Sequence, residues 1–288
     1  MSARPAFGAR LAAAMDAHGP LCVGIDPHPG LLAAWGLSDD VVGLRAFART
    51  VLDAVAGHVA AVKPQSALFE RHGAAGVAVL EEVVAAGRET GTLVIVDAKR
   101  GDIGSTMVAY ADAYLRDGSP LAGDALTVSP YLGFGSLAPA VEAAASSGRG
   151  LFVLALTSNP EGASVQHARD ADGVAVAAQI ARAAGALNAL EIDASGASLG
   201  SVGLVVGATV GPAAAQLGID LVAVRGPLLA PGVGAQGAGA AELAAVFGAA
   251  RGAVLASSSR GVLAAGPDRA SLLAAARRAA GDAATALR

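Results

Sequence analysis

The sequence predicts an α/β protein, a single (β/α)8 TIM barrel that takes in residues 1–288. Short apolar runs alternate with longer Ala-rich segments of helical character, which is typical of parallel strands joined by helical crossovers. Eight such runs are present, the number that closes a barrel of this type. The length of 288 residues also fits, because one barrel commonly occupies roughly 250 residues. No linker, charge block or internal repeat marks a second domain.

The first half of the chain supplies four of the predicted strands. They are Leu21–Asp26, Val59–Lys63, Leu93–Lys99 and Ala125–Ser129. Helices are predicted between them at Val41–Ala56, Gly73–Glu89 and Thr106–Asp117. Each strand is a short apolar run of the kind that a parallel sheet buries on both faces. Each helix is long enough to return the chain to the start of the next parallel strand.

The second half repeats the pattern with one ambiguity. The strands are Leu151–Thr157, Val202–Gly207, Leu228–Pro231 and Ala253–Ser257. The helices are Ser136–Ser146, Gly173–Leu187, Pro212–Leu217 and a terminal helix from Arg269. The segment Ile219–Val224 is also a strand-like apolar run, so either it or Leu228–Pro231 can be the seventh barrel strand.

Charge and composition exclude several classes of protein. The net charge of −4 and the pI near 5.7 give no basic field for nucleic acid or an anionic membrane surface. The uncharged segment 226–241 is interrupted by Pro and Gly, whereas a spanning helix needs about 20 mainly apolar residues. The lone Cys22 excludes an internal disulfide, and no signal core follows the basic residues near the N-terminus. We therefore expect a cytoplasmic enzyme with no nucleic-acid or membrane partner.

The use of lysine is unusual. Of the 20 basic residues, only Lys63 and Lys99 are lysines, and each ends an apolar run. Arginine keeps its proton under all ordinary conditions, whereas a lysine ammonium is compact and can give up its proton. Two lysines kept in a chain that otherwise uses arginine indicate positions where arginine would fail.

The end of the third strand carries a cluster of acids and bases. Reactive groups of such barrels lie at the carboxyl ends of strands. Asp97 and Lys99 are two residues apart on one strand, so both side chains point to the same face. Asp102 follows in the next turn and reaches the same place or an adjacent subunit. A structural ion pair inside the barrel is the alternative interpretation of Asp97 and Lys99.

Two further strand ends favour a functional site over a structural pair. Asp26 ends the first predicted strand and Lys63 ends the second. They predict a second acid–base pair beside the first. The five histidines are scattered without metal-ligand spacing, so no metal site is predicted.

A phosphate site is predicted on the other side of the barrel. The loop after the seventh strand contains Gly232, Gly234 and Gln236, and the eighth strand is followed by Arg260 and Gly261. The glycines formally match a dinucleotide fingerprint, but they lie late in the chain and no acidic residue follows about 20 positions on. Loops after strands seven and eight commonly hold phosphate in this fold. Arg260 is suited to a bidentate phosphate contact.

These residues together resemble a known family. The motif Asp97-x-Lys99-x-x-Asp102, the loop Pro-Gly-Val-Gly-Ala-Gln-Gly from Pro231 and the Ser-Arg-Gly segment that contains Arg260 are similar to those of orotidine 5′-phosphate decarboxylases. The resemblance runs from Asp26 to Arg260. Two segments, Lys63-Pro-Gln and Thr-Ser158-Asn-Pro, resemble the longer bacterial branch of that family.

The resemblance implies an activity, a set of residue roles and a homodimer. The activity is the decarboxylation of orotidine 5′-phosphate to UMP, the last step of pyrimidine nucleotide synthesis, with no cofactor and no metal. Lys63, Asp97, Lys99 and Asp102 would form the catalytic network, with Lys99 protonating C6. Asp102 and Thr106 would reach the neighbouring subunit's site. Substrate would be bound by Asp26 and Lys63 on the ribose, Ser158 on the pyrimidine, Gln236 between ring and phosphate, and Arg260, Gly261 and the Gly232 and Gly234 loop on the phosphate.

Two departures and two alternatives remain. Lys63 is followed by Pro-Gln rather than the Gly-containing turn of shorter family members, and the segments Glu161–Asp172 and Leu190–Gly200 are insertions without an assigned role. One alternative is a Mg²⁺-dependent sugar-phosphate decarboxylase or hexulose-phosphate synthase of the same suprafamily, which shares the Asp-x-Lys-x-x-Asp motif. The other is a non-catalytic sensor of a phosphorylated ligand on the same scaffold.

Overall fold

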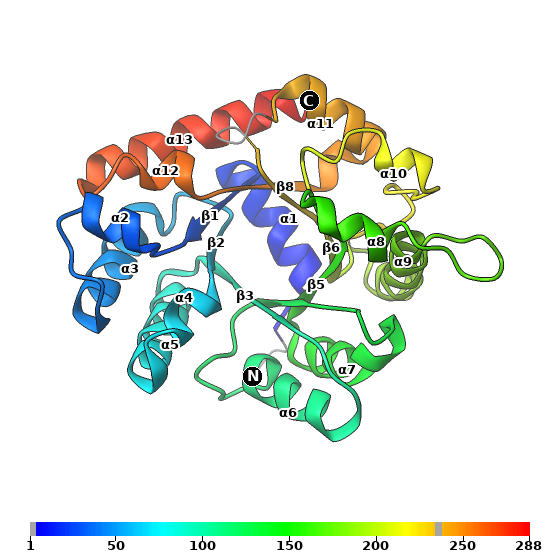
Figure 1. Ribbon diagram of the computed structural model, residues 1–288, viewed down its shortest axis with the longest axis horizontal. Helices are drawn as coiled ribbons and strands as arrows, with labels where there is room; N and C mark the ends of the chain where they lie inside the picture. Colours follow the sequence, from blue (N-terminus) through cyan, green and yellow to red (C-terminus); the bar gives the residue numbers. More distant parts are fainter. Residues whose placement is uncertain (1–3, 234–237) are drawn as a thin grey trace.

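The computed structural model, which describes residues 4–233 and 238–288, is a closed barrel of eight parallel strands in sequence order (Figure 1). The strands are β1 (Leu21–Ile25), β2 (Ala61–Pro64), β3 (Leu93–Arg100), β4 (Ala125–Val128), β5 (Gly150–Leu156), β6 (Val202–Val206), β7 (Leu228–Pro231) and β8 (Val254–Ser258). β1 pairs with β8 and thereby closes the barrel. The predicted fold class is confirmed.

Helices surround the strands on the outside, as Figure 1 shows. The longer ones are α3 (Val41–Val55), α5 (Gly73–Thr90), α6 (Gly104–Leu115), α7 (Ala138–Ser147), α9 (Val176–Ser195), α11 (Ala240–Phe247) and α13 (Arg269–Ala286). Short helices follow several strands: α2 (Pro29–Ala34), α4 (Ser66–Glu70), α8 (Ala163–Gln166), α10 (Ala213–Gln216) and α12 (Arg260–Leu263). The described residues also contain three 3-10 turns, η1 (Phe134–Leu137), η2 (Pro160–Gly162) and η3 (Gly248–Ala253). No described helix is long and apolar enough to cross a membrane.

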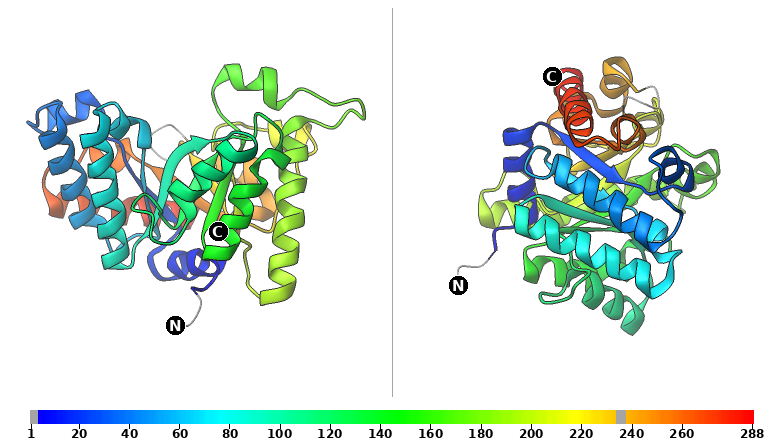
Figure 2. Two further views of the ribbon diagram at one scale, coloured as in Figure 1. Left: turned by 90° about the horizontal axis from the view of Figure 1, so that it is seen from below. Right: turned by 90° about the vertical axis from the view of Figure 1, so that its left-hand side faces the viewer.

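A helix that the sequence analysis did not predict, α1 (Phe7–His18), closes the amino end of the barrel. Its Phe7 and Leu11 are fully buried against the inward-facing strand residues, and the Phe7 ring packs edge-on to Phe152 with centroids 5.9 Å apart. Figure 2 (left) shows α1, in blue, at one end of the barrel and the segment with α8, in green, at the opposite end. With one end filled by apolar side chains, only the carboxyl end is left for ligand chemistry.

The ambiguity over the seventh strand is resolved in favour of Leu228–Pro231. The other run, Ile219–Val224, forms turns, in which the Asp220 carboxylate accepts hydrogen bonds from the backbone N–H groups of Val222 and Ala223. A side chain that satisfies the backbone locally competes with strand pairing. The buried apolar residues of this run pack in the core outside the barrel strands.

The two insertions have different structures. Most of Leu190–Gly200 continues α9, which runs to Ser195 rather than ending at the predicted Leu187. The fully buried Asn188 explains the extension, because its amide donates to the carbonyls of Val202 and Val224 and fixes the helix to the base of β6. The segment Glu161–Asp172 instead contains η2 and α8 at the carboxyl end of the barrel.

Candidate active site

The backbone at the end of β3 is irregular, and this irregularity sets the conformation of Lys99. The register between β3 and β4 shifts between Val96 and Arg100, as in a β-bulge. Lys99 has φ of +49°, a left-handed conformation that costs a side-chain-bearing residue on the order of 1–3 kcal/mol. Its backbone N–H donates to Thr127 Oγ1 at 2.9 Å. The surroundings therefore hold Lys99 in a conformation that it would not adopt alone, which is frequent at functional sites.

Asp97 lies between the two lysines of the chain. Its Oδ2 is 2.5 Å from Lys63 Nζ, and its Oδ1 is 2.5 Å from Lys99 Nζ. The side chains of Asp97 and Lys63 are buried, whereas that of Lys99 is 44% exposed. The expected meeting of Asp97 and Lys99 at the barrel mouth is found. The expected pairing of Lys63 with Asp26 is wrong: Lys63 binds Asp97, and no ion pair joins Lys63 to Asp26 in the described residues.

The charges of this cluster support one another. Burial alone would raise the pKa of Asp97, but the ammonium groups of Lys63 and Lys99 outweigh it and hold the pKa well below its usual range. Burial alone would lower the pKa of Lys63, but the carboxylates of Asp97 and Asp26 raise it above its usual value. Asp97 and Lys63 therefore remain ionised at every pH at which the protein is expected to work.

A cavity of about 370 Å³ opens above this cluster. Asp26, Lys63, Asp97 and Lys99 line it from β1, β2 and β3, and Arg260 lines it from the far side. Asp26 Oδ1 is buried with no hydrogen-bond partner among the described residues. Because an unpaired buried carboxylate oxygen is costly, Asp26 is ready to accept hydrogen bonds from a ligand.

The opposite wall of the cavity is built from β7, β8 and the segments after them. Gly232 has φ of +96°, a conformation that favours glycine, and lines the cavity with Ser257, Ser258 and Ser259. No hydrogen bond or ion pair engages the Arg260 guanidinium within the described ranges 4–233 and 238–288, so its donors are available. Gly261 lines an adjoining cavity rather than this one. Gly234 and Gln236 lie outside the described residues.

The insertion Glu161–Asp172, at the carboxyl end of the barrel, fixes the residues that follow β5. Gln166 of α8 accepts a hydrogen bond from the Thr157 backbone N–H and donates one to the Thr157 hydroxyl, at 2.9 and 2.7 Å. That hydroxyl donates in turn to Asn159. Ser158 and Asn159 line the cavity. The segment Glu161–Asp172 thus has a structural role that the sequence analysis did not assign: it holds the cavity wall that contains Ser158.

Asp102 and Thr106 do not line the cavity of their own chain. Asp102 accepts a hydrogen bond from the next backbone N–H, that of Ile103, and Thr106 is exposed on α6. Both lie beside exposed apolar side chains. Four of the eight exposed large apolar residues in the described chain are in this region, on α6 and on the connections after β3 and β4: Ile103, Val108, Tyr131 and Leu132.

Two polar residues of the site were missed by the sequence analysis. Gln65 donates to Asp97 Oδ2 at 3.2 Å, and Thr127 donates to Asp97 Oδ1 at 2.9 Å. Thr127 had a usable signal, because strand alternation puts it on the same inward face as Ala125. Gln65 lies beyond the end of β2, where alternation no longer predicts direction.

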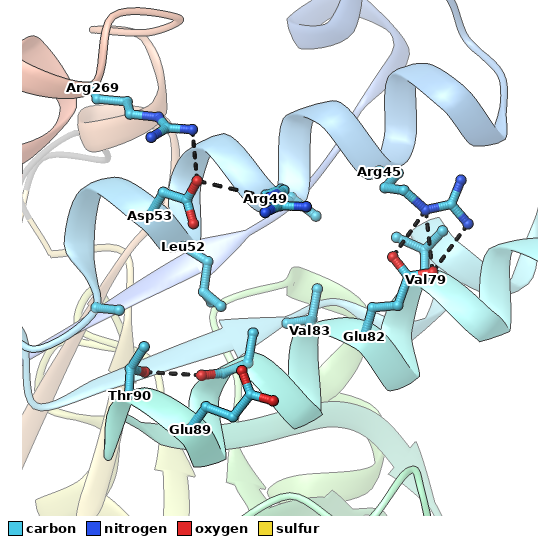
Figure 3. Close-up of a pocket in the computed structure, with 13 residues that line it drawn as sticks. Arg45, Arg49, Leu52, Asp53, Val79, Glu82, Val83, Glu89, Thr90 and Arg269 are labelled. Atoms are coloured by element: carbon cyan, nitrogen blue, oxygen red, sulfur yellow. Dashed lines mark hydrogen bonds and ion pairs between the residues drawn. The ribbon is translucent and has the colours of Figure 1, made fainter.

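A larger cavity of about 710 Å³ lies outside the barrel, between α3 and α5 (Figure 3). Its charges are mostly paired within the chain. Arg45 donates to both carboxylate oxygens of Glu82, and Asp53 forms ion pairs with Arg49 and Arg269. Beneath them the wall is formed by buried apolar residues such as Val79. The groove thus offers less unpaired polar chemistry than the barrel mouth.

The comparisons with known proteins agree on one family. Residues 19–275 match the family described as "Orotidine 5'-phosphate decarboxylase / HUMPS family". Among curated proteins, the orotidine 5′-phosphate decarboxylase of Salinispora tropica is 62% identical over 242 residues, 84% of each chain. That of Streptomyces coelicolor is 61% identical over 243 residues, again 84% of each chain.

Solved structures give the same result. A crystal structure from Streptomyces avermitilis, described as an orotidine 5′-phosphate decarboxylase, has a TM-score of 0.93 and 59% identity and covers 99% of this chain and 97% of its own. The Leishmania donovani orotidine monophosphate decarboxylase has a TM-score of 0.75 and 29% identity, with 98% of each chain covered.

Proposed function

Because the chain belongs to the orotidine 5′-phosphate decarboxylase / HUMPS family, we propose that it converts orotidine 5′-phosphate to UMP and CO2 in the cavity at the barrel mouth. Such an enzyme is a carboxy-lyase of pyrimidine nucleotide synthesis. The observation that carries the proposal is that Asp97 binds two ammonium groups, one buried and one partly exposed at the cavity, while Arg260 lines the same cavity. A cytoplasmic location belongs to the same proposal, and the buried free thiol of Cys22 is compatible with a reducing compartment.

The reaction needs a cation at the reacting carbon. When the bond between C6 and the carboxylate breaks, the electron pair stays at C6 in the plane of the ring, where the π system cannot absorb it. A positive charge fixed in advance stabilises that developing charge more than it stabilises the substrate. Lys99 supplies this charge and then transfers a proton to C6, which gives UMP. Asp97 holds the Lys99 ammonium in place through the 2.5 Å contact.

The remaining cavity residues are assigned to the nucleotide. Arg260 binds the phosphate through its guanidinium, which has no partner among the described residues, and the turn at Gly232 lets the backbone approach the same group. Gly261, Gly234 and Gln236 complete this phosphate site in the proposal. Asp26, with its unpaired buried oxygen, accepts a ribose hydroxyl and Lys63 donates to the ribose. Ser158 contacts the pyrimidine. Phosphate binding supplies energy remote from C6 that orders the site around the reacting carbon.

The first prediction tests the activity against its alternative. The protein is expected to consume orotidine 5′-phosphate, seen as a change in ultraviolet absorbance, at the same rate with and without EDTA. Loss of turnover in EDTA that Mg²⁺ restores would instead support the Mg²⁺-dependent sugar-phosphate decarboxylase or synthase. That alternative is not favoured, since the relatives at 62% and 61% identity are named as orotidine 5′-phosphate decarboxylases. Binding of the nucleotide with no absorbance change over time would support a sensor.

We further propose that the active form is a homodimer in which Asp102 and Thr106 enter the partner's cavity. Exposed apolar side chains are present on the same segments: Ile103 and Val108 flank Thr106 in the sequence, and Tyr131 and Leu132 follow the neighbouring strand β4. Exposed apolar residues that gather on one part of a surface are typical of an interface. Asp102 contacts no lysine within its own chain in the described residues, so a role for it at Lys99 requires the partner.

The second prediction tests the shared site by mixing subunits. Lys99→Ala and Asp102→Asn are each expected to be nearly inactive alone. When they are unfolded and refolded together, one of the two sites in every mixed dimer receives an intact Lys99 and an intact Asp102. Recovery of about a quarter of wild-type activity per subunit is therefore expected, because half of the dimers are mixed in a random C2 assembly. If Asp102 acts within its own chain, mixing restores no activity.

A further inference from the structure

Arg100 follows Lys99 at the end of β3, and its side chain lies on the outer side of the barrel wall. One of its terminal nitrogens, Nη2, donates to Glu70 and to the Tyr114 hydroxyl. The other, Nη1, donates to the backbone carbonyl of Ala98 at 3.2 Å. The guanidinium carbon lies 5.6 and 5.5 Å from the ring centroids of Tyr110 and Tyr114, within the range of cation–π attraction. Nothing in the reaction proposed above uses this side chain.

The contacts of Arg100 surround the strained residue beside it. Lys99 is in the left-handed region, and the strand register shifts at this point. On its C-terminal side, the Arg100 carbonyl accepts the Ser129 backbone N–H at 2.8 Å. On its N-terminal side, the Ala98 carbonyl accepts the Arg100 guanidinium. The left-handed conformation is thus flanked on one side by a hydrogen bond from Ser129, the residue after β4, and on the other by the contact of the Arg100 side chain.

The partners of Arg100 connect β3 to two helices, α4 and α6, that follow site residues in the chain. Glu70 ends α4, the helix that follows Lys63 on β2, and it also accepts the Ser66 hydroxyl at 2.5 Å. Tyr110 and Tyr114 belong to α6, which follows the Asp102 turn. Arg100 therefore joins α4, which follows Lys63, to α6, which follows Lys99. Its charge is balanced by Glu70, and the planar guanidinium makes several directed contacts at once, which a lysine could not.

We propose that Arg100 is a positioning residue: held by Glu70, Tyr110 and Tyr114, it keeps the Lys99 backbone left-handed so that the Lys99 ammonium stays on Asp97. The inference rests on the proposed decarboxylation. Without the Arg100 contacts, the Lys99 backbone relaxes toward the ordinary extended conformation. The Lys99 ammonium then leaves its position between Asp97 and the reacting carbon. Phosphate and ribose contacts are unaffected, since they come from β1, β2, β7 and β8.

The third prediction follows for Arg100→Gln. We expect kcat to fall about 10- to 100-fold, because a displacement of about 1 Å at a reacting group has an effect of this size, with KM within about two-fold of wild type. Arg100→Lys keeps the positive charge but lacks the planar guanidinium that makes several directed hydrogen bonds. Its kcat is expected to lie between those of Arg100→Gln and the wild type. The matched control is Arg71→Gln, which breaks the bidentate surface pair with Asp39 on the same side of the barrel and is expected to leave kcat unchanged.

Two further measurements separate positioning from general stability. In a Lys99→Ala background, Arg100→Gln is expected to cause no further loss of residual activity, since a residue that acts through Lys99 has no effect once Lys99 is gone. An equal loss in both backgrounds would overturn the proposal, and so would a wild-type kcat in Arg100→Gln. Arg100→Lys provides the same comparison if Arg100→Gln fails to fold.

The chain's two lysines allow a test that does not depend on activity. Protein labelled with ¹⁵N-lysine gives two side-chain ammonium signals, which Lys99→Ala assigns. In Arg100→Gln the Lys99 signal is expected to move toward that of free lysine, while the Lys63 signal stays in place as an internal control. An unmoved Lys99 signal overturns the positioning role even if the protein proves to have another activity. Failure of the proposed function would show separately, as a wild-type protein that does not turn over orotidine 5′-phosphate.

Discussion

Replacement of Lys99 by alanine is expected to lower kcat by a factor of roughly 10³ or more, because preorganised electrostatic groups at the reacting atom contribute effects of this size. The substitution removes both the charge that faces C6 and the proton that C6 receives. The fold is expected to survive, since the Lys99 side chain is 44% exposed and Asp97 keeps its second partner, Lys63. Single-turnover decay of the substrate absorbance measures the loss, and circular dichroism checks the fold.

Two companion variants show which property of Lys99 matters. Lys99→Arg keeps the positive charge but holds its proton and is larger, so it is expected to remain severely impaired. Lys99→Gly removes the side chain and at the same time relieves the left-handed backbone at φ +49°. It is expected to be as inactive as Lys99→Ala but more stable. Near-normal turnover in any of the three would rule out the assigned role of Lys99.

Strand positions were predictable because a barrel strand is a short apolar run with few alternatives. Seven of the eight strands were placed without ambiguity, and most bounds agree within one or two residues, as for Leu228–Pro231. Helix α1 was missed although Phe7, Leu11 and Met15 recur at a helical spacing of four residues, because it precedes the first strand and its role, to fill the amino end of the barrel, is visible only in three dimensions. The length of α9 depends on the contacts of Asn188 with β6, which are distant in sequence.

The site was predictable where strand alternation governs direction and unpredictable beyond it. The two-residue spacing correctly placed Asp97 and Lys99 on one face. The same rule could not show that Lys63 pairs with Asp97 instead of Asp26, because that depends on the relative stagger of neighbouring strands. Nor could it show the left-handed backbone of Lys99 or the role of Arg100, since both arise from contacts with α4, α6 and β4.

The second large effect is expected for Asp97→Asn, in which two ammonium groups lose their shared carboxylate. Lys63 is buried, so its charge becomes uncompensated. Removal of one partner of a buried ion pair typically costs about 3–5 kcal/mol of unfolding free energy. Turnover is expected to fall as well, because Lys99 loses the group that holds it. The matched control is Asp39→Asn, which breaks the exposed pair with Arg71 and should change the free energy of unfolding much less, because solvent screens an exposed ion pair.

The pH dependence of this stability difference follows from the direction of the pKa shift. Burial opposes the charged form of Asp97, but Lys63 and Lys99 outweigh it, so the folded-state pKa lies below that of the unfolded chain. The wild-type advantage over Asp97→Asn is therefore fully present above the unfolded pKa of about 4. It declines as the pH falls from there toward the folded-state pKa. Urea unfolding at pH 7 and pH 3 measures the difference, which is expected to be smaller at pH 3. A difference that stays constant between these pH values would show that the charge of Asp97 contributes nothing, and that the two lysines are held by packing alone.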